Sequence, residues 1–372
     1  EHLILLQAVT KCDLRLAGGQ PKVHSENMDS LRPLFLLRQS QPAPTAKGQR
    51  LVRITNVSGG NMFSDQPMQT TVSDVVAFDG IGLHSGRFVH LTVYPAPANT
   101  GIQFKRIDVT ENRQSITAHP DNVRKARLCT RIENSDGVRL ETVEHLMAAF
   151  AGLGIDNAIV HIDSGEAPIL DGSSLPFVAS LQNAGITTLS ARRRTLVVTQ
   201  TVRVEHGDGW AMIEPHSRLE IDAEIDFEDP AIGRQRFHYQ HGNGRFENDL
   251  AAARTFCQMR DVAAMQNAGL ALGGSLNNAI VVENGRILNE TGLRMKHEFV
   301  KHKILDCLGD LYLLGMMVRG KVTTARPGHA ICAELVTRLW DATESYRIVE
   351  EGVLVGHSDG YALPEVAAAA AV

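Results

Sequence analysis

The order of predicted strands and helices repeats along this 372-residue chain, and this repeat constrains the fold more than any single motif. In each half, three strand-like segments precede an amphipathic helix. The helical segments "TVEHLMAAFAG" (142–152) and "FVKHKILDCLG" (299–309) each carry a valine two positions before a histidine, followed by an apolar run. This similarity indicates an internal duplication. It predicts two α+β domains that face each other, with the two helices beside a shared cleft.

The repeat divides the chain into four predicted regions. Residues 68–190 form the first α+β domain and residues 195–350 the second, with "ARRR" (191–194) at the transition. Residues 351–372 are expected to form a C-terminal tail. Residues 1–67 contain segments rich in Pro, Gly, Ser and Gln, which rarely pack, so we expect a disordered or non-native extension there.

The start of the native protein is a separate question, because the chain does not begin with Met. Met62 and Met68 stand just before the first clear strand. We therefore expect the working protein to begin at one of them, with the upstream part a cloning or translation artefact. A true flexible extension is the alternative, and the intact mass of the natively expressed protein distinguishes the two.

Composition excludes several classes of function. Hydrophobic residues make up 43% of the chain and charged residues 21%, as in soluble globular proteins. The net charge of −5 comes from interspersed acids and bases, so no basic patch points to nucleic acid. No apolar run approaches the ~18 residues of a transmembrane helix. The five cysteines are scattered and form no C-x-x-C pair, which favours a reducing cytoplasm over a disulfide framework.

The helix expected over 295–315 carries four polar residues at four-residue steps: Glu298, His302, Asp306 and Asp310. Residues four apart lie on one helix face, so His302 and Asp306 can bind one ion. Glu298 with His302 has the same spacing, and geometry alone does not choose between these pairs. A solvated polar face is the structural alternative, because charge rows of this spacing are common on surface helices.

A second candidate is "TVEHL" (142–146), in which Glu144 and His145 are adjacent near the start of a helix. A hydrolytic zinc ion needs about three protein ligands, an open position for water and a base close by. His145, His302 and Asp306 would supply the ligands. Glu144 would then reach the water. The alternative is a chance Glu-His pair.

Two further segments carry single candidates. His329 in "RPGHA" sits in a predicted Gly-Pro loop, where histidines on a rigid scaffold are often functional, although a capped turn histidine is equally common. Thr255 in "ARTF" has a hydroxyl that can stabilise an oxyanion, although a threonine on a helix face would explain it as well. His84 and His161 are expected to be structural, in a turn and in mid-strand.

Together these segments resemble a known family. The collinear motifs run from about Met68 to the C-terminus and are "GIGLHSG", "PAPANTGIQFKR", "ARLCTRI", "ETVEHLMAAFAGLGIDN", "APILDGSSLPFV", "AARTF", "LGGSLNNAIVV", "LRMKHEFVKHKILDCLGDLYLLG" and "GHA". They are similar to those of the UDP-3-O-acyl-N-acetylglucosamine deacetylase family, zinc enzymes of lipid A biosynthesis in Gram-negative bacteria. The resemblance implies hydrolysis of the N-acetyl amide of UDP-3-O-(3-hydroxyacyl)-N-acetylglucosamine, with release of acetate.

Two other functions remain as alternatives. One is a zinc amidohydrolase that acts on another N-acylated substrate. The other is a non-catalytic protein that binds nucleotide sugars or lipids on a duplicated scaffold.

The resemblance also implies the fold, the cofactor and the partners. Two similar α+β domains, each a β-sheet with helices, place their helices between the two sheets in a β-α-α-β sandwich. An insert at about residues 257–289 forms a hydrophobic passage for the acyl chain. The implied cofactor is Zn²⁺, and a site of two histidines and one carboxylate also suits Fe²⁺. We expect a cytoplasmic monomer that acts on an acylated UDP-amino sugar, with neither a nucleic-acid partner nor a transmembrane segment.

The family's functional groups map onto individual residues of this chain. Those that match the zinc ligands are His145, His302 and Asp306. Those that match catalytic groups are the general base Glu144, the protonated acid His329, the carbonyl-side threonine Thr255 and the supporting carboxylate Asp310. Those that match groups near the substrate are Lys303 at its polar head, Phe256 beside it and Cys129 near the metal. Glu298 receives no such role and is assigned to the solvated face.

Overall fold

The computed structural model describes residues 52–53, 67–242 and 244–352. The expected start at Met62, most of the predicted extension and most of the predicted tail lie outside these residues. The described residues all belong to one compact unit.

The first half of the chain builds a five-stranded sheet. Its strands are β3 (Val76–Ile81), β4 (Phe88–Pro95), β5 (Ile102–Arg106), β6 (Ser115–Thr117) and β10 (Ala158–Ile162). The order is β3-β4-β10-β5-β6, and β10 runs antiparallel to β4 but parallel to β5. Alternate residues of β10 are buried, as expected where one face of a sheet lies on the core.

Two smaller sheets complete this half. One pairs β2 (Met68–Val72) with β11 (Ile186–Arg192), and the other joins β7 (Val123–Arg124), β8 (Arg131–Glu133) and β9 (Arg139–Glu141). Because β11 pairs back to β2, the chain stays in the first half until Arg192. It passes to the second large sheet over the next residue, within the predicted transition.

The second half builds an eight-stranded sheet around β20 (Met317–Ala325), along which every second residue is buried. The other strands are β12 (Arg194–Val198), β13 (Val202–His206), β14 (Gly209–Glu214), β15 (Leu219–Asp226), β16 (Arg234–Gln240), β21 (Tyr346–Glu350) and β1 (Val52–Arg53). β1, which lies within the predicted extension, pairs in parallel with β21.

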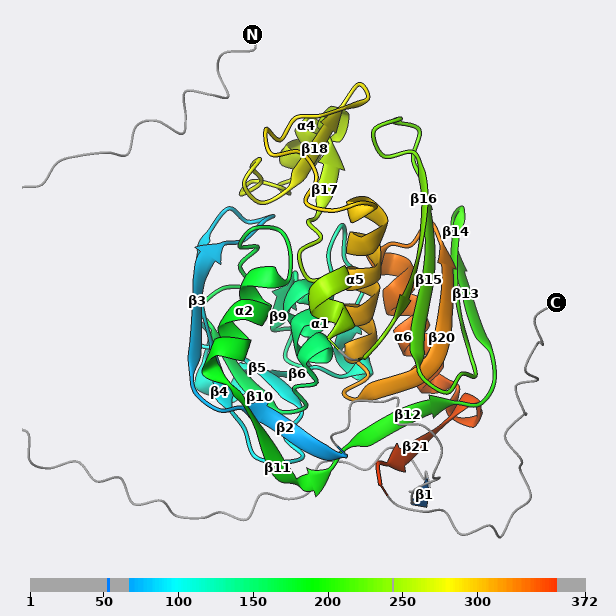
Figure 1. The fold of residues 1–372 in the computed structure, drawn as a ribbon. Helices are drawn as coiled ribbons and strands as arrows, with labels where there is room; N and C mark the ends of the chain where they lie inside the picture. The colour runs from blue at the N-terminus through cyan, green and yellow to red at the C-terminus, as the bar shows by residue number, and fades with distance from the viewer. Residues whose placement is uncertain (1–51, 54–66, 243, 353–372) are drawn as a thin grey trace, which may run out of the picture. The chain divides into compact units, whose positions relative to one another are not determined.

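Four helices lie between the two large sheets (Figure 1). They are α1 (Glu144–Leu153), α2 (Leu175–Ala184), α5 (Glu298–Tyr312) and α6 (His329–Asp341). α2 packs on β3, α5 on β15 and β16, and α6 on β13 and β14, while α1 packs against α5. This arrangement confirms the predicted α+β class with helices between two sheets. No helix in the described part of the chain has the length and apolar content to cross a bilayer.

The close approach of α1 and α5 depends on one glycine. A Cβ atom at Gly309 would lie 2.1 Å from the carbonyl oxygen of Glu144, so no larger residue fits without moving a helix. Around this crossing, Met147, Phe150 and Leu308 are almost fully buried. The crossing brings the first turn of α1 against the later turns of α5, which places His145 beside Asp306.

The insert in the second half has its own small sheet. Its strands are β17 (Phe256–Gln258), β18 (Ile280–Glu283) and β19 (Arg286–Ile287), and its helix is α4 (Met259–Asn267). The alanine-rich segment 246–269 does not form one continuous helix, because within it only α3 (Arg245–Asp249) and α4 are helical. Thr255 instead donates its N–H to Gly172 and accepts from Ile280, both at 2.8 Å. These tertiary bonds override the helix propensity of the alanine-rich segment.

Candidate functional site

Three buried side chains from two helices converge on one point. His145 comes from the first turn of α1, and His302 and Asp306 come from successive turns of α5. Asp306 Oδ1 lies 3.3 Å from His302 Nε2 and 3.5 Å from His145 Nε2. One ligand atom from each residue lies within 4.8 Å of the other two. The structure thus brings together the three residues predicted as metal ligands.

The polar atoms of this triad fit a metal ion. Asp306 Oδ1 and His145 Nδ1 are buried without a hydrogen-bond partner among the described residues. His302 donates its Nδ1–H to the Ala253 carbonyl at 3.1 Å, which directs its Nε2 lone pair toward the carboxylate. Two imidazole nitrogens and one carboxylate oxygen are ligands that zinc and Fe(II) both accept.

The electrostatics at Asp306 and His302 favour the protonation states that bind a metal. Burial would raise the pKa of Asp306, but the interaction with His302 and the positive charge of Lys303 outweigh this effect and hold the pKa well below its usual range. Burial lowers the pKa of His302 to about 3. A deprotonated carboxylate and a neutral imidazole are the ligand forms, so no proton must be displaced at neutral pH.

Glu144, the predicted base, is buried beside the triad. Its Oε2 accepts the backbone N–H of Thr130 at 3.1 Å, and its Oε1 lies 3.7 Å from Nε2 of His329. Burial raises the pKa of Glu144 against the opposing charges of His329 and His145. A carboxylate with a raised pKa accepts a proton more readily near neutral pH, so the environment suits a general base.

His329 begins a helix rather than lying inside a loop. The Gly328 carbonyl accepts the N–H groups of Ile331 and Cys332, both at 3.0 Å, so the Gly-Pro loop ends at Gly328 and His329 is the first residue of α6. The predicted loop position is therefore wrong by one residue. The sequence interpretation did not include α6 at all.

His329 is surrounded by acceptors. Its Nε2 faces Glu144, and its Nδ1 lies 3.6 Å from Asp310 Oδ2. Burial alone would lower the pKa of His329, but the neighbouring carboxylates, Glu144 first, outweigh burial and raise it to about 9. His329 is consequently a cation at neutral pH, as a proton donor must be.

Thr130 is a residue of this site that the sequence interpretation missed. Its Oγ1 donates to Asp310 Oδ1 at 2.5 Å and lies 3.1 Å from His329 Nδ1, while its N–H binds Glu144. It therefore contacts the predicted base, the predicted acid and the supporting carboxylate. No spacing rule connects residue 130 with residues 310 and 329, so only the fold reveals these contacts.

Two predicted substrate-side residues lie next to the triad. Lys303 donates its Nζ to Asp306 Oδ2 at 3.1 Å and lies 5.5 Å from the centre of the Phe256 ring. That ring is 6.3 Å from the ring of His302. Burial would lower the pKa of Lys303, but Asp306 outweighs it and raises the pKa. A cation and an aromatic ring thus border the triad on the side of the insert.

Thr255 and Cys129 are close in sequence to residues that contact the site. Thr255 follows Ala253, the residue whose carbonyl holds His302, by two positions and is partly buried. Cys129 is buried and directly precedes Thr130. Burial, and then the charge of Glu144, raise the pKa of the Cys129 thiol, which keeps it protonated at neutral pH.

The assignment of Glu298 to a solvated face is wrong. Its side chain is fully buried and forms an ion pair with Arg254, with Nε and Oε1 2.8 Å apart. The other three members of the polar row on α5, His302, Asp306 and Asp310, are buried too. Because sheets and helices cover α5 on all sides, an amphipathic pattern in the sequence did not imply an exposed face.

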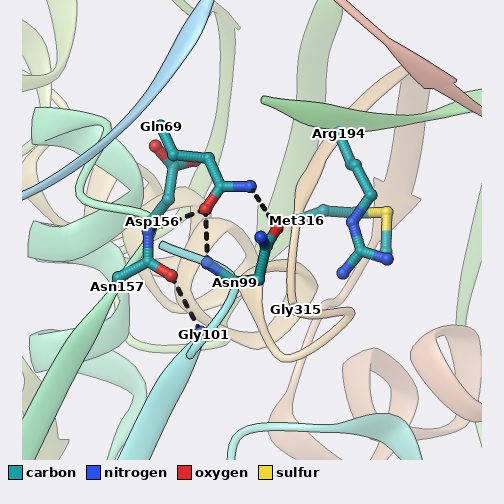
Figure 2. A pocket seen from close by; sticks show the side chains of 8 residues that line it. All are labelled: Gln69, Asn99, Gly101, Asp156, Asn157, Arg194, Gly315 and Met316. Atoms are coloured by element: carbon teal, nitrogen blue, oxygen red, sulfur yellow. Dashed lines mark hydrogen bonds between the residues drawn. The ribbon is translucent and has the colours of Figure 1, made fainter. Parts of the chain in front are cut away.

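A second polar region lies past the C-terminal end of α1 (Figure 2). It is a hollow of about 300 Å³, open mouth included, lined by Gln69, Asn99, Gly101, Asp156, Asn157, Arg194, Gly315 and Met316. Its amide side chains bind one another: Gln69 Oε1 accepts from the Asn99 N–H at 2.8 Å and from Asn157 Nδ2 at 3.0 Å. The amides of Gln69 and Asn157 are therefore already paired within the protein.

Comparison with known proteins shows which family this chain belongs to. The family model "UDP-3-O-acyl N-acetylglycosamine deacetylase" matches residues 69–341, which include every candidate residue. The chain belongs to this deacetylase family. It is 45% identical over 283 residues to the UDP-3-O-acyl-N-acetylglucosamine deacetylase of Shewanella halifaxensis, covering 76% of this chain and 92% of that protein. The corresponding protein of Pseudoalteromonas translucida is 47% identical over 279 residues, covering 74% and 91%.

Membership of this deacetylase family identifies the chain as an amide-hydrolysing enzyme and confirms the resemblance drawn from its motifs. The roles of the individual residues and the identity of the metal stay predictions.

Proposed function

We propose that this enzyme hydrolyses the N-acetyl amide of UDP-3-O-(3-hydroxyacyl)-N-acetylglucosamine, using a zinc ion held by His145, His302 and Asp306. The product acetate leaves behind a free amine on the sugar, in a step of lipid A biosynthesis. The names of the relatives supply the substrate. The observation that carries the proposal is the convergence of the three ligand atoms within 4.8 Å, beside a buried carboxylate and a protonated histidine.

The first half of the reaction requires a proton acceptor. When bound, zinc lowers the pKa of its water to roughly 7 and polarises a carbonyl. Glu144, adjacent in sequence to His145, would accept the proton of the attacking water at its carboxylate. The N–H of Thr130 holds Oε2 of that carboxylate, which leaves Oε1 free to face the reacting atoms.

The second half requires a proton donor, because an amide nitrogen does not leave as an anion. His329, with its pKa raised to about 9, carries the proton at neutral pH. Its charge would stabilise the tetrahedral oxyanion before Nε2 donates to the departing amine. Asp310 and Thr130 hold Nδ1 from the opposite side of the ring. Thr255 is proposed to donate its hydroxyl to the oxyanion.

The polar head of the substrate is proposed to bind Lys303, which carries a positive charge beside Phe256. The acyl chain would occupy the insert around α4. The nine residues of α4 are all partly or fully exposed, so the Met, Val and Ala side chains of this helix are accessible to a ligand. The cysteines at 129, 257, 307 and 332 are free, which agrees with a proposed location in the reducing cytoplasm.

The test combines metal analysis with a choice of substrates. The purified enzyme is expected to contain zinc and to deacetylate the acylated UDP-sugar far faster than free N-acetylglucosamine or an N-acetylated peptide. A chelator should abolish activity, and added Zn²⁺ should restore it. Equal rates on all three substrates would overturn the proposed specificity, and full activity in metal-free protein would overturn the mechanism.

A further inference from the structure

Glu298 is the most heavily bonded carboxylate near the triad, yet it is neither a ligand nor a base in the proposed function. Its Oε1 accepts Nε of Arg254 at 2.8 Å and the backbone N–H of the same residue at 3.2 Å. Its Oε2 accepts Nη2 of Arg254 at 3.2 Å and the N–H of Arg294 at 2.6 Å. Both charged side chains are at most 5% exposed. Such a bidentate pair fixes geometry as well as charge.

The pair joins two segments that meet at the metal triad. Glu298 is the first residue of α5, and His302 stands one turn later on the same face. Arg254 lies between Ala253 and Thr255. The carbonyl of Ala253 accepts Nδ1–H of His302 at 3.1 Å. The same helix face therefore binds residue 254 through a carboxylate and residue 253 through an imidazole.

A metal-binding imidazole needs its other nitrogen held, because that bond sets both the tautomer and the direction of the ring. Here the acceptor is a backbone carbonyl in an irregular segment, which has no helix of its own to hold it between α3 and β17. The ion pair at residue 254 is the charged contact that joins this segment to α5, in addition to the bonds of Thr255 to Gly172 and Ile280. Arg254 Nη2 also donates to the Gly292 carbonyl at 2.7 Å, which restrains the arginine itself.

We infer that the buried Arg254–Glu298 pair is a positioning device for the metal ligand His302. It holds the Ala253 carbonyl where that oxygen orients the imidazole, and it sets the place of Thr255 through the same segment. This inference rests on the proposed function, since it assumes that His302 binds zinc. It assigns a role in metal affinity to two residues that touch neither the metal nor the substrate.

The test measures zinc affinity in metal-free protein by competition with a chromophoric chelator. Arg254→Met and Glu298→Gln should each weaken zinc binding by about 10–100-fold, the usual effect of losing a partner that orients a ligand. With Co²⁺ as the probe, the visible absorption band of the bound ion should also shift. Wild-type affinity in a folded Arg254→Met protein would overturn the inference.

Removing one partner of a buried ion pair can prevent folding, because the other charge stays buried. The double variant Arg254→Met with Glu298→Leu removes both charges and is expected to fold. It should still bind zinc about tenfold more weakly or worse, because the carbonyl is no longer held. Unchanged affinity in this double variant would contradict a positioning role.

A second buried ion pair provides a matched control. Arg193 and Asp156 are 2.8 Å apart, with side chains 5% and 11% exposed, and lie past the far end of α1. Arg193→Met should lower stability and leave zinc affinity within about twofold. Equal zinc loss in Arg193→Met and Arg254→Met would mean a general stability effect and would refute the inference. Absence of zinc binding in the wild type would instead refute the proposed function itself.

Discussion

The two ends of α1 carry two buried polar clusters that differ in one respect. At the start of the helix, around Glu144 and His145, three buried atoms have no hydrogen-bond partner in the described part of the chain: Asp306 Oδ1, Asp310 Oδ2 and His145 Nδ1. Just past its end, the side-chain amides of Asn157 and Gln69 are paired. Asn157 Nδ2 donates to Gln69 Oε1 and to the Thr70 carbonyl, and its Oδ1 accepts from Gly101.

This difference in hydrogen-bond pairing suggests different roles for the two clusters: we propose that the first binds a ligand and that the second stabilises the fold. Buried polar atoms normally find partners, since an unpaired one costs about 1–3 kcal/mol. We therefore propose that a ligand from outside the chain completes the bonding of the unpaired atoms at the start of α1. The paired cluster past its end needs nothing further and joins β2 to the residues that follow α1.

The largest expected effect is loss of a metal ligand. His302→Ala and Asp306→Ala should each remove zinc and reduce deacetylation below detection, because two remaining ligands do not hold the ion. Metal analysis of the purified variants checks this. Full zinc occupancy in both variants would show that the unpaired atoms at the start of α1 have another purpose.

The pH dependence tests the acid and the base in the same cluster. The rate should rise as Glu144, whose pKa is raised, loses its proton, and it should fall as His329 loses its own above about pH 9. His329→Gln should remove the alkaline limb and lower kcat roughly 10²–10³-fold, as loss of an oxyanion donor does. A flat wild-type profile between about pH 5 and 9, with chemistry rate-limiting, would contradict these two roles.

A smaller effect is expected for Thr130, which bonds the other members of the cluster. Thr130→Val keeps its shape and its N–H but removes the hydroxyl between Asp310 and His329. Bonds to charged groups are worth about 1.5–3 kcal/mol, so kcat should fall roughly 10–100-fold. Thr130→Ser restores the hydroxyl and should recover most of the rate. If the serine and valine variants are equally slow, the hydroxyl is not the important group.

The smallest effect on activity belongs to the paired cluster. Asn157→Ala leaves the Gly101 N–H and part of Gln69 without partners and should lower the free energy of unfolding by about 1–3 kcal/mol. Its kcat and zinc content, measured per folded molecule, should stay within about twofold of wild type. A large loss of kcat with normal zinc would erase the distinction between the two ends of α1.

Much of the fold could be predicted because its patterns are local. The alternation along β10 and the apolar side of α1 are read directly from neighbouring residues. The segment around Thr255 could not be predicted in this way. Its alanines favour a helix, but bonds to Gly172, Ile280 and Glu298 hold it in an irregular path. Those partners are distant in sequence, so no local sequence pattern predicts the bonds to them.

The candidate site shows the same limit. The spacing of His302 and Asp306 indicated a shared ion, but Glu298 and His302 have the same spacing. The structure separates them, because Glu298 faces Arg254 while His302 and Asp306 face His145. Thr130 was missed because its role lies in contacts with three distant residues. The exposure of Glu298 was also predicted wrongly, because a helix that is buried on every side, such as α5, still shows an apolar stripe in its sequence.

Glu144→Gln tests the central claim most directly, because the substitution preserves size and removes only the base. We expect one zinc ion per chain in wild type and variant alike, with a single-turnover rate about 10²–10⁴-fold lower in the variant. A variant that keeps its zinc and its full rate would contradict the proposed mechanism at its first step.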